Sequence, residues 1–217
     1  MKFKLKIKSP TMVLGFDARH YISLDNKTVL AFRSTAAASF GKMKMLYSLG
    51  GMENWIFPRF NETIPLPEAD KFTYQMLAAP LRGFQNNIRN GSNFALINAE
   101  LRVPVTEYLS RTPPSNVMLR NLQLVAFYDV GTAWQGLSPF SKDNPLNTTT
   151  VDPGTGGAVV SPVRVRVNYF RRPIVQGLGF GLRTVFLGYF IRMDYAWGVE
   201  TGDLQTPMVY LSLGMDF

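Results

Sequence analysis

The sequence contains no cysteine among its 217 residues and only one histidine, His20. The absence of cysteine excludes disulfide frameworks, thiol nucleophiles and cysteine-ligated zinc sites. A single histidine leaves one candidate for any reaction that needs imidazole, and the G-x-S-x-G motif of serine hydrolases is absent. We therefore expect no enzyme activity, no cofactor and no metal site.

Long apolar runs are also missing. Charge-free stretches such as 130–141 fall well short of the ~18 apolar residues of a membrane-spanning helix. The first eight residues alternate lysine with apolar residues and lack the continuous apolar segment of a signal peptide. An exported protein needs such a segment, so we expect either a chain that is not exported or a true N-terminus upstream of Met1.

The composition that remains is that of a folded chain with few charges. Hydrophobic residues make up 46% and charged residues 18%, the net charge is +8, and the mean hydropathy is close to zero. The hydrophobic content excludes a disordered chain. No nucleic-acid-binding motif accompanies the positive charge, so nucleic acid is not an expected partner.

Alternation of apolar and polar residues with a period of two is the main structural signal. In the last segment, Val209, Leu211 and Leu213 share one face, and Tyr210 and Ser212 share the other. The second face of most such segments carries charges and glycines, with Val125 and Phe127 as large apolar exceptions. About eight strands are predicted, most near the ~9–11 residues of a tilted membrane strand, at 3–8, 12–22, 29–36, 95–103, 122–131, 177–183, 190–197 and 209–217.

The same alternation is typical of a soluble β-sandwich, in which one face is core and the other is hydrated. Three features favour a transmembrane β-barrel. Aromatic residues lie near strand ends, short and long connections alternate, and the chain ends on Phe217 within its last strand. A barrel also explains the neutral mean hydropathy, because lipid-facing and lumen-facing residues alternate.

The lengths of the connections predict which ends of the strands lie together. Segments 25–27 and 187–189 are tight turns, whereas 41–91, 134–173 and 198–207 are long. Outer-membrane barrels have short periplasmic turns and long extracellular loops. We therefore expect 41–91 to be extracellular and the C-terminus to be periplasmic.

Several ordered segments resemble one family of outer-membrane barrels. Leu81-Arg82-Gly83-Phe84 is similar to the R-G-F motif of the BamA/TamA-type assembly barrels, the bacterial surface antigen family. The chain end resembles the family's C-terminal assembly signal, at Tyr210, Leu213, Gly214, Met215 and Phe217. Similar segments occur in the family's order at 50–51, 98–104, 126–134, 177–183 and 192–196.

The resemblance implies an all-β fold, in which this chain supplies about eight C-terminal strands of an antiparallel transmembrane barrel of about sixteen. It also implies that 41–91 folds back into the lumen, where Arg82 contacts Asp129 and Glu100. Gly83 would give the backbone freedom, and Phe84 would pack on the wall. The alternation independently assigns Asp129 and Glu100 to the polar face. No soluble domain is expected within 1–217.

An eight-stranded barrel is filled by its own side chains and leaves no room for a loop of this length. The chain is therefore expected to be part of a larger barrel or, as the alternative, to pair with a second copy. Two roles remain open for the Arg82 contacts: a structural staple, or a latch needed for insertion or secretion.

The expected function is insertion or translocation of polypeptides in the bacterial outer membrane. The alternatives are a passive or structural barrel and, third, a soluble β-sandwich binding module. Expected partners are outer-membrane lipids, client polypeptides, and lipopolysaccharide, an anionic lipid that loop arginines would attract, at Arg164, Arg166, Arg171 and Arg172.

Overall fold

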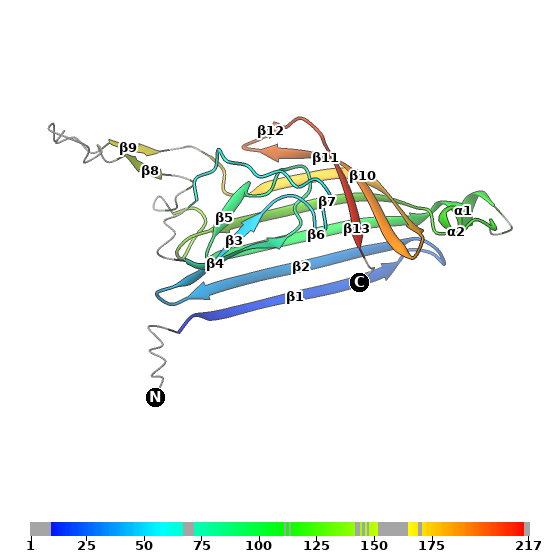
Figure 1. Cartoon of the computed structure of the whole chain (residues 1–217), viewed down its shortest axis with the longest axis horizontal. Coiled ribbons are helices and arrows are strands. Elements are labelled where there is room, and N and C mark those ends of the chain that lie inside the picture. The colour runs from blue at the N-terminus through cyan, green and yellow to red at the C-terminus, as the bar shows by residue number, and fades with distance from the viewer. Residues whose placement is uncertain are drawn as a thin grey trace, which may run out of the picture.

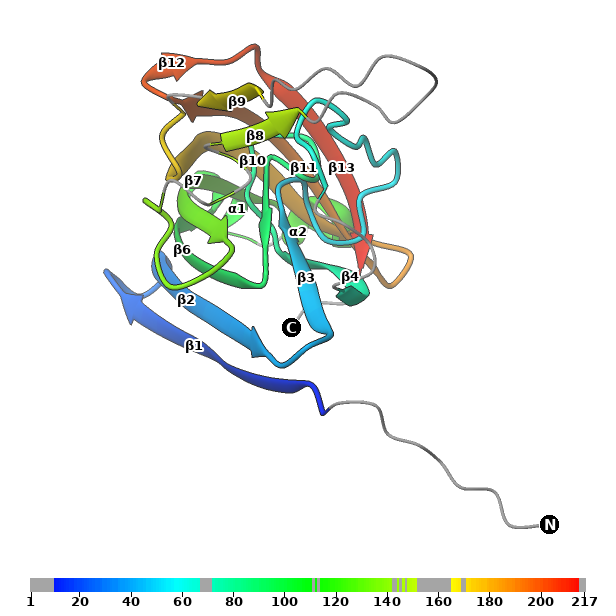
Figure 2. The ribbon, with the colours of Figure 1, turned by 90° about the vertical axis from the view of Figure 1, so that its left-hand side faces the viewer.

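The structure is a computed structural model of the whole chain. It describes residues 10–66, 72–110, 112, 114–141, 144, 146, 148–151, 165–168 and 171–214. One antiparallel sheet dominates the architecture and curves around a long internal segment (Figures 1 and 2). Residues 41–91, which join the second and third long strands of that sheet, are called the insertion below.

The main sheet has eight strands in the order β1-β2-β6-β7-β10-β11, with β12 and β13 both paired to β11. All neighbours are antiparallel. The strands are β1 (Met12–Ser23), β2 (Val29–Phe40), β6 (Asn93–Pro104), β7 (Gln123–Trp134), β10 (Val175–Phe186), β11 (Tyr189–Glu200), β12 (Asp203–Leu204) and β13 (Met208–Gly214).

The all-β prediction is confirmed, and seven predicted strands are present at the expected places. The predicted strand 3–8 lies outside the described residues. The sheet is not a closed barrel, because β1 and β13 are its two edges and are not paired with each other. All residues of β1 are exposed, since this strand has only β2 as a neighbour.

The long connections contain more regular structure than the sequence indicated. The insertion holds β3 (Lys44–Leu49), which pairs in parallel with β4 (Phe72–Ala79) and antiparallel with β5 (Arg89–Gly91). The segment between β6 and β7 contains helices α1 (Val105–Leu109) and α2 (Val117–Arg120). A hairpin of β8 (Thr148–Val151) and β9 (Val165–Asn168) precedes β10. No helix in the described part of the chain could cross a membrane.

The two faces of the main sheet differ in the way that the alternation predicted. The face turned towards the insertion, called the inner face, carries buried polar groups such as Asp129, Asp194 and Arg183. The opposite, outer face exposes large apolar side chains: Leu14, Phe16, Ile97, Leu124, Tyr128, Phe180, Met193, Val209 and Leu213. Charged residues are rarely buried, and soluble monomers rarely expose large apolar patches, and this sheet does both.

The insertion packs against the inner face through two apolar clusters. In the first, Leu49 and Leu81 of the insertion lie with Leu96 and Val175 of the sheet, all almost completely buried. In the second cluster, Trp55 lies against Tyr210, with ring centroids 4.8 Å apart. Burial of these side chains holds the insertion within the curve of the sheet, where Figure 2 shows β3 and β4.

Candidate functional site

Arg82 lies at the centre of the inner face. It is 4% exposed, and it follows directly on Leu81, which is buried in the first apolar cluster. Its guanidinium makes two short hydrogen bonds to Asp129, from Nε to Oδ2 and from Nη2 to Oδ1, both 2.8 Å long. This two-point geometry is the strongest form of arginine–carboxylate pairing.

Two more carboxylates face the same guanidinium. Arg82 Nη1 donates to Glu100 Oε1 at 2.7 Å and lies 3.5 Å from Asp194 Oδ2. Burial disfavours the charge of Arg82, but the three carboxylates, Asp129 foremost, outweigh it and raise its pKa above the ordinary value. Arg82 is therefore a permanent cation at this position.

The contacts of Arg82 with Asp129 and Glu100, which the resemblance implied, are thus both present within one chain. No second copy is needed to supply them. The expectation that an eight-stranded unit has no room for the insertion applied to a closed barrel. The sheet is open at β1 and β13 and curves widely enough to enclose the insertion.

The carboxylates around Arg82 are themselves held by other groups. Glu100 accepts from Arg183 Nη2 at 2.7 Å and from Arg102 Nη2 at 2.9 Å. Asn98 donates its side-chain amide to Asp129 Oδ1 at 2.7 Å. These three positions come from β6 and β10. Asp129 lies on β7 and Asp194 on β11, so the ion cluster connects the insertion to four strands of the main sheet.

Phe127 completes the surroundings of Arg82. Its ring centroid lies 3.6 Å from Arg82 Cζ, which places the guanidinium over the aromatic face. Phe127 was one of the two large apolar exceptions on the polar face of its strand. Phe127 lies on this face because its ring supplies a flat surface for the buried guanidinium of Arg82.

Glycine is the residue type that the backbone requires at position 83. Its φ is +94°, and a Cβ there would lie 2.5 Å from the backbone carbonyl group of Trp197. Gly177 on β10 is equally constrained, since a Cβ would lie 1.9 Å from the Arg82 carbonyl oxygen. Backbone of the insertion therefore packs directly on backbone of the sheet.

Phe84 packs on the sheet, and Tyr210 holds the backbone of the Gly83-Phe84 segment. Phe84 is 4% exposed, and its ring lies over Gly198 of β11. The Tyr210 hydroxyl accepts from the Gly83 N–H at 2.9 Å and donates to the Phe84 carbonyl at 2.7 Å. Tyr210 was predicted only as part of the C-terminal signal, so its bond to the insertion was missed.

The other predicted signal residues are placed only in part. Leu213 is exposed on the outer face, and Gly214 ends β13. Met215 and Phe217 lie outside the described residues. Arg164 of the predicted lipopolysaccharide contacts is also outside them, and for Arg166 only the backbone is described.

A second buried arginine of the insertion was missed altogether. Arg89, in β5, donates to Glu200 at 2.8 Å and to the backbone carbonyl groups of Ile88, Arg172 and Pro173. Burial lowers the pKa of Arg89, and the charge of Glu200 offsets this only in part. Its partners are mostly carbonyl oxygens, which leave no pattern in a sequence.

The arrangement around Arg82 is suited to holding a loop in place. Its three carboxylates are all directed at arginine, and no group of three or more histidine and acidic side chains in the described residues could hold a metal ion. No protein-family model, curated protein or solved structure matches this chain.

Proposed function

We propose that this chain forms part of an outer-membrane β-barrel that inserts or translocates polypeptides. The observation that carries the proposal is the Arg82-Gly83-Phe84 segment, locked by ion pairs into the inner face of a sheet whose outer face is apolar. The outer face would contact lipid, and the inner face would line the lumen.

The ends of the strands support an orientation for this proposal. Short turns at 24–28 and 187–188 lie at one end of the sheet, together with α1 and α2, and the long connections lie at the other (Figure 1). In this orientation the long connections are extracellular, and β13 ends on the periplasmic side.

The edge strands favour a larger assembly. An unpaired strand edge in lipid leaves backbone groups without partners, which is costly in a medium without water. At β13 the insertion pairs with part of the second edge, through the bridge between Trp55 and Ser212 and the hydrogen bond from Ile56 N–H to the Leu211 carbonyl. Strand β1 and the rest of the β13 edge would therefore pair with further strands, either from the remainder of a longer protein or from a second copy. The buried contacts of Arg82 within one chain favour the first arrangement.

Reconstitution in lipid vesicles tests the function. We expect vesicles that contain the complete barrel to accelerate the folding of an outer-membrane client protein relative to empty vesicles. The matched control is the same barrel with Asp129→Asn and Arg82→Gln together, which removes the central ion pair. Equal client folding with and without the wild-type barrel would contradict insertase activity and leave a passive barrel.

A second candidate, the passive or structural barrel, is favoured by one observation. Two apolar clusters and the Arg82 ion cluster fill the space between the insertion and the sheet. A soluble sandwich fits less well, because its outer face would be hydrated. Partitioning tests this point: a protein that remains in solution without detergent would contradict the membrane proposal.

A further inference from the structure

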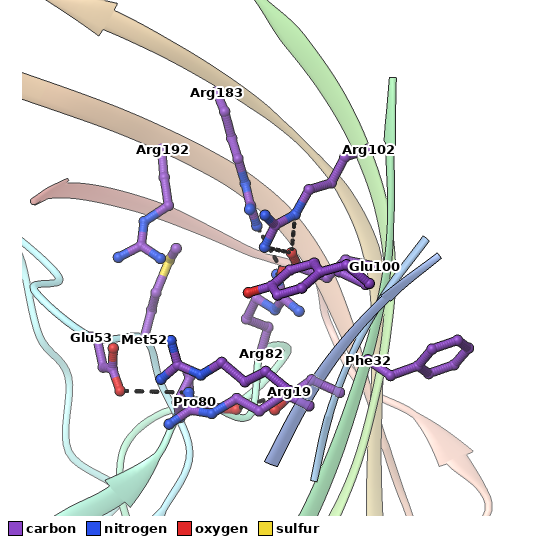
Figure 3. A pocket seen from close by; sticks show the side chains of 14 residues that line it. Arg19, Phe32, Met52, Glu53, Pro80, Arg82, Glu100, Arg102, Arg183 and Arg192 are labelled. Carbon is purple, nitrogen blue, oxygen red and sulfur yellow. Dashed lines mark hydrogen bonds and ion pairs between the residues drawn. The ribbon is translucent and has the colours of Figure 1, made fainter. Parts of the chain in front are cut away.

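The cavity beside Arg82 is lined by arginines that already have acidic partners. Figure 3 shows Arg102 and Arg183 directed at Glu100, and Arg33 pairs with Glu53 at 3.8 Å. A second cavity, of about 740 Å³, lies elsewhere on the main sheet. It combines apolar walls with one lysine.

The second cavity is a groove across the main sheet, near the end at which the long connections lie. Four register partners form one row on the outer face of neighbouring strands: Leu14 of β1, Ala38 of β2, Asn93 of β6 and Trp134 of β7. Next to this row, Phe16 lies opposite Ala36. The alanine side chains are short, so the larger side chains of β1 and β7 stand on either side of them as walls.

The groove is formed by the chain itself. The side-chain amide of Asn93 donates to the Gly136 carbonyl at 2.8 Å, which holds the segment after β7 beside the groove. Leu137 follows in that segment and lines the groove, as does Phe40 at the end of β2. Leu14, Phe40 and Leu137 are at least half exposed, so the groove is open on the outer face.

Lys44, at the start of β3, lines the same groove. It is half-buried, and it has no acidic partner in the described part of the chain. No acidic residue is among the described residues that line the groove. Lys42, two residues earlier in the turn after β2, is exposed. Positive charge therefore lies at an apolar groove without a negative charge beside it.

We propose that this groove binds lipopolysaccharide, with acyl carbon against its apolar walls and a phosphate group at Lys44. The proposal rests on the membrane location in the proposed function. Apolar side chains favour acyl chains, and a lysine ammonium group is a point charge that attracts phosphate. A volume of about 740 Å³ lies within the ~300–1,000 Å³ of ordinary ligand pockets.

The position of the groove favours lipopolysaccharide over a phospholipid. The groove lies at the end of the sheet with the long connections, which is the extracellular end in the proposed orientation. The outer leaflet on that side of an outer membrane is built mainly from lipopolysaccharide, which carries several acyl chains and phosphate groups. Its chemistry therefore matches both the walls of the groove and Lys44.

Lipid retention by the purified full chain in detergent tests the site. Native mass spectrometry counts bound lipopolysaccharide, phosphatidylglycerol and phosphatidylethanolamine after equal exposure to each. We expect lipopolysaccharide to remain bound at detergent concentrations that remove the two phospholipids. Equal retention of the three lipids would overturn the proposal, and so would a dimer that forms in place of bound lipid.

Substitutions locate the binding. Ala38→Phe fills the groove and should weaken retention about tenfold, the effect of displacing about two acyl CH₂ groups. Ala126→Phe adds the same ring at an exposed position outside the groove and should have no effect.

The charge is tested separately. Lys44→Gln should weaken retention about fivefold, as expected for one basic side chain near an anionic lipid, whereas Lys44→Arg should retain most of the binding. Lys27→Gln, at the opposite end of the sheet, is the control. Unchanged retention in Ala38→Phe or in Lys44→Gln would overturn the assignment. The wild-type comparison of the three lipids decides the matter alone if these variants do not fold.

The vesicle assay separates this inference from the proposed function. Accelerated client folding by a barrel that retains the three lipids equally would overturn the lipopolysaccharide site and leave the function intact. Selective retention of lipopolysaccharide without any acceleration of client folding would support the site and contradict the function.

Discussion

The two buried arginines of the insertion, Arg82 and Arg89, are held in opposite ways. Three carboxylates face Arg82, and their combined charge raises its pKa in spite of burial. Arg89 faces one carboxylate and three carbonyl oxygens, and burial lowers its pKa. The two arginines therefore differ in what their removal would leave unpaired. Without Arg82, buried negative charges would lose their partner, whereas without Arg89 mainly neutral acceptors would lose theirs.

The largest expected effect comes from Arg82→Gln. Removing one member of a buried ion cluster leaves uncompensated charge, and the expected loss of unfolding free energy is about 3–5 kcal/mol. Urea unfolding in detergent measures it. Limited proteolysis should cut the insertion, residues 41–91, more rapidly in this variant than in wild type.

A double-mutant cycle is the control for that prediction. Asp129→Asn in the Arg82→Gln background removes the stranded carboxylate, so the double variant should be less destabilised than the sum of the single variants. Additive losses would show that the two side chains do not depend on each other, and the account of Arg82 would then be wrong.

Arg89→Gln should cost less, about 2 kcal/mol, because carbonyl oxygens and a partly exposed carboxylate remain. The same unfolding measurement compares it with Arg82→Gln. Glu200→Gln is the matched control and should have a smaller effect still. A loss for Arg89→Gln that equals the loss for Arg82→Gln would contradict the proposed difference between the two arginines.

Tyr210→Phe tests the neutral hydrogen bonds beside Arg82. It deletes the hydroxyl that joins the Gly83 N–H and the Phe84 carbonyl, and leaves both groups buried. The expected loss of unfolding free energy is about 1 kcal/mol. Faster amide hydrogen exchange at Gly83 in this variant would support the assignment, and unchanged exchange would argue against it.

The smallest effect is expected at a carboxylate held without arginine. The Tyr108 hydroxyl and the backbone N–H groups of Thr28 and Lys27 hold the pKa of Asp25 at about 2. A lowered pKa contributes stability that is present above the unfolded value and is lost as the pH falls towards 2. Tyr108→Phe should raise the pKa of Asp25 in an NMR titration, and an unchanged value would contradict this role.

The sequence predicted the main sheet well because its strands alternate between two environments. Seven strands with that alternation are present, and their apolar and polar faces are oriented as expected. Strands β3 and β4 escaped prediction, because they lie within the insertion and pair in parallel across a long separation in the chain. Such pairing has no local signature.

The candidate site was predicted where a motif marked it. Arg82, Asp129 and Glu100 were found from the resemblance and from the polar face of each strand. Asp194, Arg183 and Tyr210 lie on polar faces too, but alternation gives a face and not a distance. Nothing in the sequence indicated the role of Arg89, because its partners are mostly backbone carbonyl groups, which every residue carries. The distances depend on how far the sheet curves, which the sequence does not display.

Amide hydrogen exchange of residues 81–88 in the lipid-reconstituted protein tests whether the Arg82 ion cluster locks the insertion onto the inner face of the sheet. We expect slow exchange for this segment in wild type, and exchange that is faster by several orders of magnitude in Arg82→Gln. Equal exchange of the segment in the two proteins would contradict this role of the ion cluster.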